Sequence, residues 1–118
     1  TLEEAGALIE RVGHPRLGLL ADTFHMNIEE RSIEDSLRSF ARYLRHVHVA
    51  DSNRRPPGLG HLNFRRILQV LWEVGYQGYL SVEWEKKWHP EIPEPEVALP
   101  QHARVLRAYL QEITPPAG

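Results

Sequence analysis

Three short apolar runs, each ending near a carboxylate or a histidine, constrain the fold of this chain most strongly. The runs occupy residues 17–22, 46–50 and 79–84 and predict β-strands. Segments with helical periodicity alternate with them, and strands that alternate with helices of about 10–15 residues form right-handed βαβ units with a parallel sheet. Because the carboxyl ends of parallel strands meet at one edge of a sheet, side chains near those ends are expected to share one site.

Helix signals fill the intervals between the predicted strands. Thr1 precedes Glu4 with capping-box spacing, and Ser32 and Asn63 are N-cap residue types that precede amphipathic stretches. Helices are expected over residues 1–12, 32–44, 63–74 and 96–113, and loops over residues 23–31, 51–60 and 85–95. The chain is therefore predicted to be an α/β protein in which one helix is followed by three βα units with parallel strands.

Three parallel strands do not form a closed sheet. A complete (β/α)8 barrel takes about 250 residues, whereas this chain has 118. Open edges of a buried parallel sheet present unpaired backbone groups and invite further pairing. We therefore expect either that the chain is part of a larger protein or that another copy of it completes the fold.

The amino-acid composition limits the kinds of partner that the chain is expected to bind. The formal net charge of −2 gives no general attraction to nucleic acid or to anionic membranes. No apolar run approaches the roughly 18–20 residues that span a bilayer. The chain has no cysteine, which excludes disulfides and thiolate metal sites. We expect a cytoplasmic protein without nucleic-acid or membrane partners.

Strand alternation places candidate ligands on one face of the predicted sheet. Asp22, His48 and Glu83 fall on the polar faces of the three strands, near their carboxyl ends. The opposite faces are apolar and suit packing under helices; their residues are Leu19, Ala21, Val47, Val49, Leu80, Val82 and Trp84. Two carboxylates and one imidazole at equivalent depth form a donor set for a divalent cation, with Mn²⁺, Mg²⁺, Co²⁺ and Zn²⁺ as candidates.

The candidate residues also have ordinary structural interpretations. Asp22 is at a position typical of a turn or helix cap, and His46 and His48 are compatible with hydrogen-bonded core histidines. His25, just past the first strand, is compatible with a ligand, a substrate hydrogen-bond donor or a solvated loop residue. Arg54 is compatible with binding an oxygen-rich substrate or with a solvated loop charge.

Three segments of the chain resemble the xylose-isomerase-like TIM-barrel superfamily, in particular its sugar isomerases and epimerases, which include the ketose 3-epimerases. They are residues 22–30, residues 46–60 and residues 78–83, and their order and spacing agree along essentially the whole chain. The resemblance implies that residues 1–118 form the C-terminal part of a (β/α)8 TIM barrel, with its sixth, seventh and eighth strands and their helices.

The resemblance also implies a role for each candidate. Asp22, His48 and Glu83 are expected to be metal ligands, with Mn²⁺ the first candidate, and Glu83 is expected to be one of two catalytic carboxylates. His25 and Arg54 are expected to bind the sugar substrate.

His46 precedes His48 on the same face, and the resemblance implies that it supports this ligand from the barrel interior. In the family a fourth ligand, which is also the second catalytic carboxylate, ends the strand that would precede Thr1. We therefore expect this chain to carry three of four ligands and to be inactive alone. It would need an N-terminal half or a homo-oligomer partner to close the sheet.

The activity that the resemblance implies is metal-dependent isomerisation or epimerisation of a sugar or sugar phosphate, by proton transfer through an enediolate. A non-catalytic or self-assembling half-barrel is the alternative. A nuclease related to endonuclease IV is disfavoured, because residues 54–57 lack its further Asp-x-His pair and the chain lacks the basic character of a DNA-binding protein.

Overall fold

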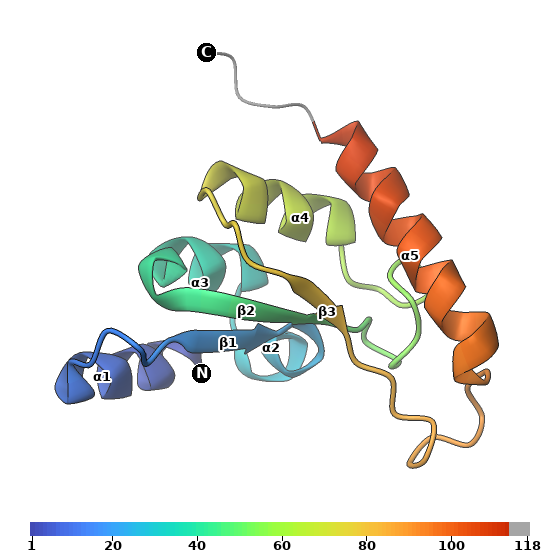
Figure 1. Ribbon diagram of the computed structural model, residues 1–118, viewed down its shortest axis with the longest axis horizontal. Coiled ribbons are helices and arrows are strands. Elements are labelled where there is room, and N and C mark those ends of the chain that lie inside the picture. The colour runs from blue at the N-terminus through green and yellow to red at the C-terminus, as the bar shows by residue number, and fades with distance from the viewer. Residues whose placement is uncertain (114–118) are drawn as a thin grey trace.

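The computed structural model describes residues 1–113 and has the predicted α/β architecture (Figure 1). Its elements in chain order are α1 Leu2–Val12, β1 Leu19–Asp22, α2 Thr23–Glu29, α3 Ile33–Ser39, the 3-10 turn η1 Ala41–Tyr43, β2 Leu44–Val49, α4 Phe64–Glu73, β3 Leu80–Val82 and α5 Pro95–Glu112. Within residues 1–113 the strands form one sheet in the order β1-β2-β3, and both pairings are parallel. The outer edges of β1 and β3 are open in this part of the chain.

The strand register brings the candidate ligands to the same level. Asp22 pairs with His48 across β1 and β2, and His48 pairs with Ser81 across β2 and β3. The Glu83 amide continues the ladder beyond β3, since its N–H donates to Val49 O at 3.5 Å. The predicted meeting of the three strand ends is confirmed.

The two faces of the sheet differ in the way that alternation predicts. One face is at most 4% exposed and forms the core with the apolar side of α4; its residues are Leu19, Ala21, Val47 and Val49. On the other face of β1, Leu20 is 49% exposed. Figure 1 shows α4 along the sheet and α5 beside the carboxyl ends of the strands. The face that carries Asp22 and His48 is thus left partly open.

Two predicted segments were wrong by more than two residues. The segment expected to be a loop over residues 23–31 contains α2, because the Asp22 side chain caps it: Oδ1 accepts from the Phe24 and His25 amides at 3.0 and 3.2 Å. The helix expected over residues 32–44 ends at Ser39, and Leu44 opens β2 instead. Leu44 pairs with Leu19 and is 5% exposed, so burial in the sheet decides its conformation over helical periodicity.

Side-chain caps start α1, α3 and α4 as the sequence predicts. Thr1 and Glu4 form a complete capping box, and Gly13 ends α1 with φ of 64°. Ser32 Oγ accepts from the Asp35 amide at 3.2 Å, and Asn63 Oδ1 accepts from the Arg66 amide at 3.1 Å. These contacts satisfy backbone donors that the helices themselves leave unpaired.

Replacing Ser32 by alanine is expected to lower the free energy of unfolding by about 1 kcal/mol, because the first turn of α3 loses its cap. Urea denaturation followed by circular dichroism measures the change. Ser39→Ala is the matched control, since Ser39 is exposed at the other end of α3. Equal effects of the two substitutions would contradict a specific capping role.

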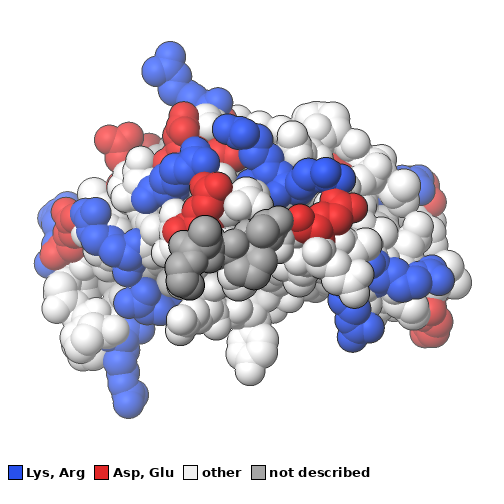
Figure 2. All heavy atoms as spheres, turned by 90° about the horizontal axis from the view of Figure 1, so that it is seen from above, with Lys and Arg blue, Asp and Glu red and all other residues white. Residues whose placement is uncertain are grey.

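Charged side chains of both signs are interspersed on the face in Figure 2. Cross-element ion pairs include Arg38 with Glu73, which joins α3 to α4, and Arg65 with Glu112, which joins α4 to α5. Exposed pairs of this kind contribute about 0–1 kcal/mol each, so the apolar core dominates stability. No helix in residues 1–113 combines the length and the apolar character needed to cross a membrane.

His102 helps to seat α5 against the loop that follows β3. The residue is 0% exposed, its Nδ1–H donates to Ala98 O at 2.9 Å, and its ring meets the Trp84 ring edge-on at 5.1 Å. Trp84 Nε1–H in turn donates to Pro93 O at 3.1 Å. Burial lowers the pKa of His102, because the charged imidazolium would lose its hydration.

Acidification is therefore expected to destabilise the fold through His102. Its pKa in the unfolded chain is about 6.5, and the folded pKa is lower, so between these values the unfolded state binds more protons. The stabilising contribution is complete above the unfolded pKa and is lost as pH falls towards the folded one. Urea unfolding of the wild type and of His102→Gln at about pH 7 and about pH 5 measures this. Parallel pH profiles for the two proteins would contradict it.

Candidate metal centre

Asp22, His48 and Glu83 converge at the carboxyl ends of the three strands. Each offers one donor atom, and these atoms all lie within 4.8 Å of one another. Asp22 Oδ2 is 3.7 Å from His48 Nδ1, and Glu83 Oε1 is 4.0 Å from the same nitrogen. The side chains are 10%, 29% and 32% exposed, so the cluster is sheltered and still open to solvent.

In each carboxylate one oxygen is engaged with the protein while the other faces His48. Asp22 Oδ1 caps α2, and Glu83 Oε2 accepts from Arg54 Nη1 at 2.9 Å. These contacts set the orientation of both side chains in the structure. The geometry leaves Asp22 Oδ2 and Glu83 Oε1 free to bind a cation.

The donor set fits a divalent cation. Donors that bind a metal at about 2.1 Å lie roughly 3.0–3.4 Å apart, so the observed separations, which are 3.7 and 4.0 Å from His48 and at most 4.8 Å within the set, would shorten by side-chain rotation. Two carboxylate oxygens and one imidazole nitrogen are ligands that Mn²⁺, Mg²⁺, Co²⁺ and Zn²⁺ accept. Three protein ligands also leave coordination positions for further groups.

Arg54 is held rigidly beside this cluster. It is 7% exposed, and its guanidinium carbon lies 3.7 Å from the centre of the Phe24 ring. Its backbone has φ of 63°, a left-handed conformation that is uncommon for a non-glycine residue. The interpretation of Arg54 as a solvated loop charge is therefore wrong.

The loop that carries Arg54 is organised by Asp51, which is 0% exposed. Its carboxylate accepts backbone N–H bonds from Ser52, Gly58 and Leu62 at 2.7, 2.9 and 3.1 Å. A side chain at Gly60 would put its Cβ 2.3 Å from Asp51 Oδ1, so this position requires glycine. Sequence reasoning missed this role, although an Asp that directly precedes a Gly- and Pro-rich loop is its signal.

Thr23 is a second residue that sequence reasoning missed. It is 1% exposed and exchanges two hydrogen bonds with Ala50: its hydroxyl donates to Ala50 O at 2.7 Å and accepts from Ala50 N at 3.0 Å. These bonds join the end of β1 to the end of β2. They hold Asp22 and His48 at a fixed separation.

The structure places His46 and His25 differently with respect to the cluster. His46 Nε2 lies 2.8 Å from Ser81 Oγ, and its ring meets the His48 ring edge-on at 5.2 Å. His25 is exposed at the start of α2 and lines a shallow cavity of about 290 Å³ together with Asp22 and Leu20. His46 is therefore packed behind the cluster, and His25 lies at its margin.

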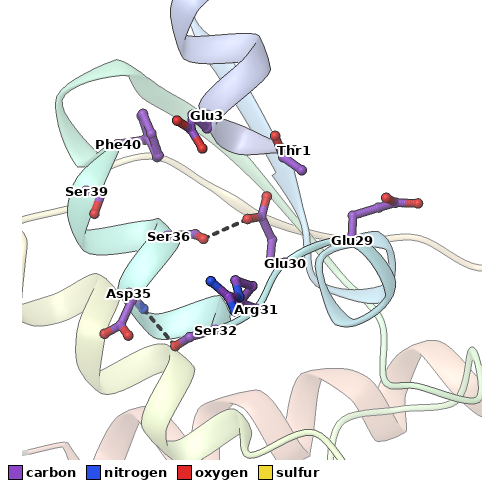
Figure 3. A pocket seen from close by; sticks show the side chains of 10 residues that line it. All are labelled: Thr1, Glu3, Glu29, Glu30, Arg31, Ser32, Asp35, Ser36, Ser39 and Phe40. Carbon is purple, nitrogen blue, oxygen red and sulfur yellow. Dashed lines mark hydrogen bonds between the residues drawn. The ribbon is translucent and has the colours of Figure 1, made fainter.

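A second cavity of about 560 Å³, which shares Thr1, Glu29 and Glu30 with the first, lies beside α1, α2 and α3 (Figure 3). It is lined by acidic and hydroxyl side chains that include Glu3, Glu29 and Glu30. Glu30 already accepts from the Leu2 amide at 2.6 Å and from Ser36 Oγ at 2.7 Å. Because this carboxylate is committed to joining α1 to α3, its function is structural.

A parallel α/β sheet with chemistry-bearing side chains at the carboxyl ends of its strands is the arrangement found in β/α barrels and in doubly wound sheets. The model of the family described as xylose isomerase-like TIM barrel matches residues 1–109. The chain belongs to this family.

Among relatives, D-psicose 3-epimerase of Ruminiclostridium cellulolyticum is 37% identical over 83 residues, which are 70% of this chain and 28% of that protein. The 3-dehydro-D-guloside 4-epimerase of Escherichia coli is 36% identical over 83 residues, which are 70% of this chain and 32% of that protein. A solved structure of L-ribulose 3-epimerase superposes with a TM-score of 0.86 at 26% identity, covering 96% of this chain and 42% of that one. The chain thus spans about a third of the length of these relatives.

Proposed function

We propose that this chain provides part of the active site of a metal-dependent sugar isomerase or epimerase. The observation that carries the proposal is the convergence of Asp22, His48 and Glu83 within 4.8 Å at the strand ends. The epimerase relatives support the reaction class. The substrate would be a ketose or a related keto sugar, in its free or phosphorylated form.

Asp22, His48 and Glu83 would hold the cation, with Mn²⁺ as the first candidate. A bound divalent cation supplies charge stabilisation for the oxyanion that forms when the C–H beside a carbonyl loses its proton. Glu83 would take or return that proton, because its carboxylate lies at the cluster, beside the position where the substrate would bind.

Arg54 and His25 would bind the substrate oxygens. Arg54 is pre-positioned by Phe24 and Glu83, so little side-chain entropy is lost when it orients a hydroxyl. His25 is exposed beside Asp22, where an incoming sugar would meet it. His46 would keep the His48 ring in place through its packing against it.

We also propose that β1, β2 and β3 correspond to the sixth, seventh and eighth strands of a barrel. The open outer edges of β1 and β3 within residues 1–113 and the exposed Leu20 support this assignment. Further strands, from an N-terminal half or from another copy of the chain, would cover the open face. They would also bring the second catalytic carboxylate, which also serves as a fourth ligand.

A chimera tests the proposal. This chain would replace the matching segment of the Ruminiclostridium cellulolyticum D-psicose 3-epimerase, and conversion of D-psicose would be followed by NMR with Mn²⁺ present. The chimera is expected to be active, and the same chimera with Glu83→Gln is expected to lose activity by more than about 100-fold. A folded, Mn²⁺-binding chimera that leaves D-psicose unchanged would contradict the proposed reaction.

A further inference from the structure

Arg54 lies between two carboxylates, and the site described above uses only one of them. Its Nη1 is 2.9 Å from Glu83 Oε2 and 3.7 Å from Glu85 Oε1. A single guanidinium nitrogen therefore has a close partner and a second acceptor within reach. Either carboxylate could therefore pair with Arg54 when a cation binds.

The guanidinium itself has little freedom to move. Arg54 is 7% exposed, stacks on Phe24 at 3.7 Å, and has a buried Nε without a hydrogen-bond partner in the described part of the chain. A buried cation that loses its counter-charge is strongly destabilised. Any loss of the Glu83 contact must therefore be offset by another acceptor at the same place.

Glu83 is more exposed than Arg54 and lies between the guanidinium and the cation position. Its side chain is 32% exposed, and while Oε2 accepts from Arg54, Oε1 lies 4.0 Å from His48 Nδ1 at the cation position. A cation between Asp22, His48 and Glu83 would draw the Glu83 carboxylate away from Arg54. The Arg54–Glu83 bond and cation binding are thus in competition.

Glu85 is anchored where the second acceptor is needed. Its backbone carbonyl accepts from the Trp88 and His89 amides, each at 3.0 Å, so the turn after β3 is fixed. Its side chain is 28% exposed, and its Oε2 lies 4.0 Å from His89 Nε2. A small rotation brings Oε1 from 3.7 Å into hydrogen-bond distance of Arg54 Nη1.

We propose that Glu85 is a positioning residue that takes over the Arg54 guanidinium when Glu83 turns to the cation. The exchange keeps Arg54 paired and in place in both states, and it lowers the cost of releasing Glu83. The inference rests on the cation site of the proposed function. It gives a role to Glu85, which is not one of the proposed ligands.

Titration calorimetry of this chain with Mn²⁺ tests the exchange in three variants. Glu85→Gln removes the acceptor charge and is expected to weaken Mn²⁺ binding by about tenfold, the low end for residues that support metal ligands. Glu85→Asp keeps the charge but withdraws the carboxylate by about 1.5 Å, one carbon–carbon bond, and is expected to weaken binding nearly as much. Glu91→Gln is the matched control: Glu91 contacts His89 on the same loop and is 61% exposed, so binding should stay within about twofold.

The outcomes separate the possible explanations. If Glu85→Asp binds Mn²⁺ with wild-type affinity and Glu85→Gln binds it weakly, Glu85 acts only through its negative charge at a distance. That result would overturn the exchange. Unchanged binding in both variants would also overturn it and leave the cation site standing. A wild-type chain that binds no Mn²⁺ would overturn the cation site and the exchange together.

A spectroscopic readout separates the exchange from a purely structural role. The Arg54 guanidinium ¹⁵N signals would be recorded with and without Mg²⁺, which is diamagnetic. In the wild type they are expected to shift and to stay protected from solvent exchange, whereas in Glu85→Gln they are expected to lose protection only when Mg²⁺ is present. Loss of protection without Mg²⁺ would indicate a structural role and overturn the proposal.

Discussion

Replacing His48 by alanine is expected to lower Mn²⁺ affinity by more than about 100-fold, beyond the loss caused by residues that merely support metal ligands. The reason is geometric. Asp22 Oδ2 and Glu83 Oε1 both face His48 Nδ1, at 3.7 and 4.0 Å, so the imidazole is the common member of the donor set. Without it two carboxylates remain, and they repel each other unless a cation lies between them. Titration calorimetry measures the affinity.

His46→Gln is the matched control for this substitution. His46 is also a histidine on β2, on the same face and two residues earlier, but its Nε2 is paired with Ser81 Oγ at 2.8 Å. Glutamine retains a polar group there but removes the ring that packs against His48, so Mn²⁺ affinity is expected to fall by only about tenfold, the low end for residues that support metal ligands. Equal losses in both variants, or none in His48→Ala, would show that the cation binds elsewhere.

Replacing Phe64 by alanine is expected to lower the free energy of unfolding by about 3–5 kcal/mol, the usual cost of deleting a buried aromatic ring. Phe64 is 1% exposed at the first position of α4, where it packs into the core beneath the sheet. The loss is a large fraction of the stability of a small domain, which is about 5–15 kcal/mol. Urea denaturation followed by circular dichroism measures it.

Tyr79→Ala is the control for the loss of an aromatic ring. Tyr79 is 82% exposed, and its backbone carbonyl accepts from the Tyr76 hydroxyl at 2.7 Å. The expected change is within about 0.5 kcal/mol, as for surface substitutions. A similar loss for Phe64 and Tyr79 would contradict the assignment of Phe64 to the core.

The order of elements was predictable because periodicity and caps act locally. Each such signal depends on only a few neighbouring residues. The structure confirms the caps at Ser32 and Asn63, and it confirms the alternation of Val47 and Val49 with His46 and His48. The end of α3 was not predictable in this way. Leu44 continues the helical pattern of residues 33–44, and only its pairing with Leu19, distant in sequence, assigns it to β2.

The candidate site, too, could be predicted only in part from local patterns. Asp22, His48 and Glu83 were predictable as neighbours because parallel strands align their carboxyl ends, and the structure brings them together. The contacts of Arg54 with Phe24 and Glu85 depend on how a long loop folds over the strand ends, which no local pattern encodes. Asp22 itself shows that its two interpretations are compatible, since one oxygen caps α2 and the other faces His48.

Because one oxygen of Asp22 caps α2 and the other faces the proposed cation position, α2 would report on cation binding. A cation at Oδ2 would withdraw electron density from Oδ1, and its binding would order the side chain that starts the helix, so the stability of α2 and the cation affinity would be thermodynamically linked. The Phe24 and His25 amides donate to Oδ1. Their hydrogen-exchange rates should therefore change with Mg²⁺ concentration, while those of the Glu4 and Asp35 amides, which other side chains cap, should not.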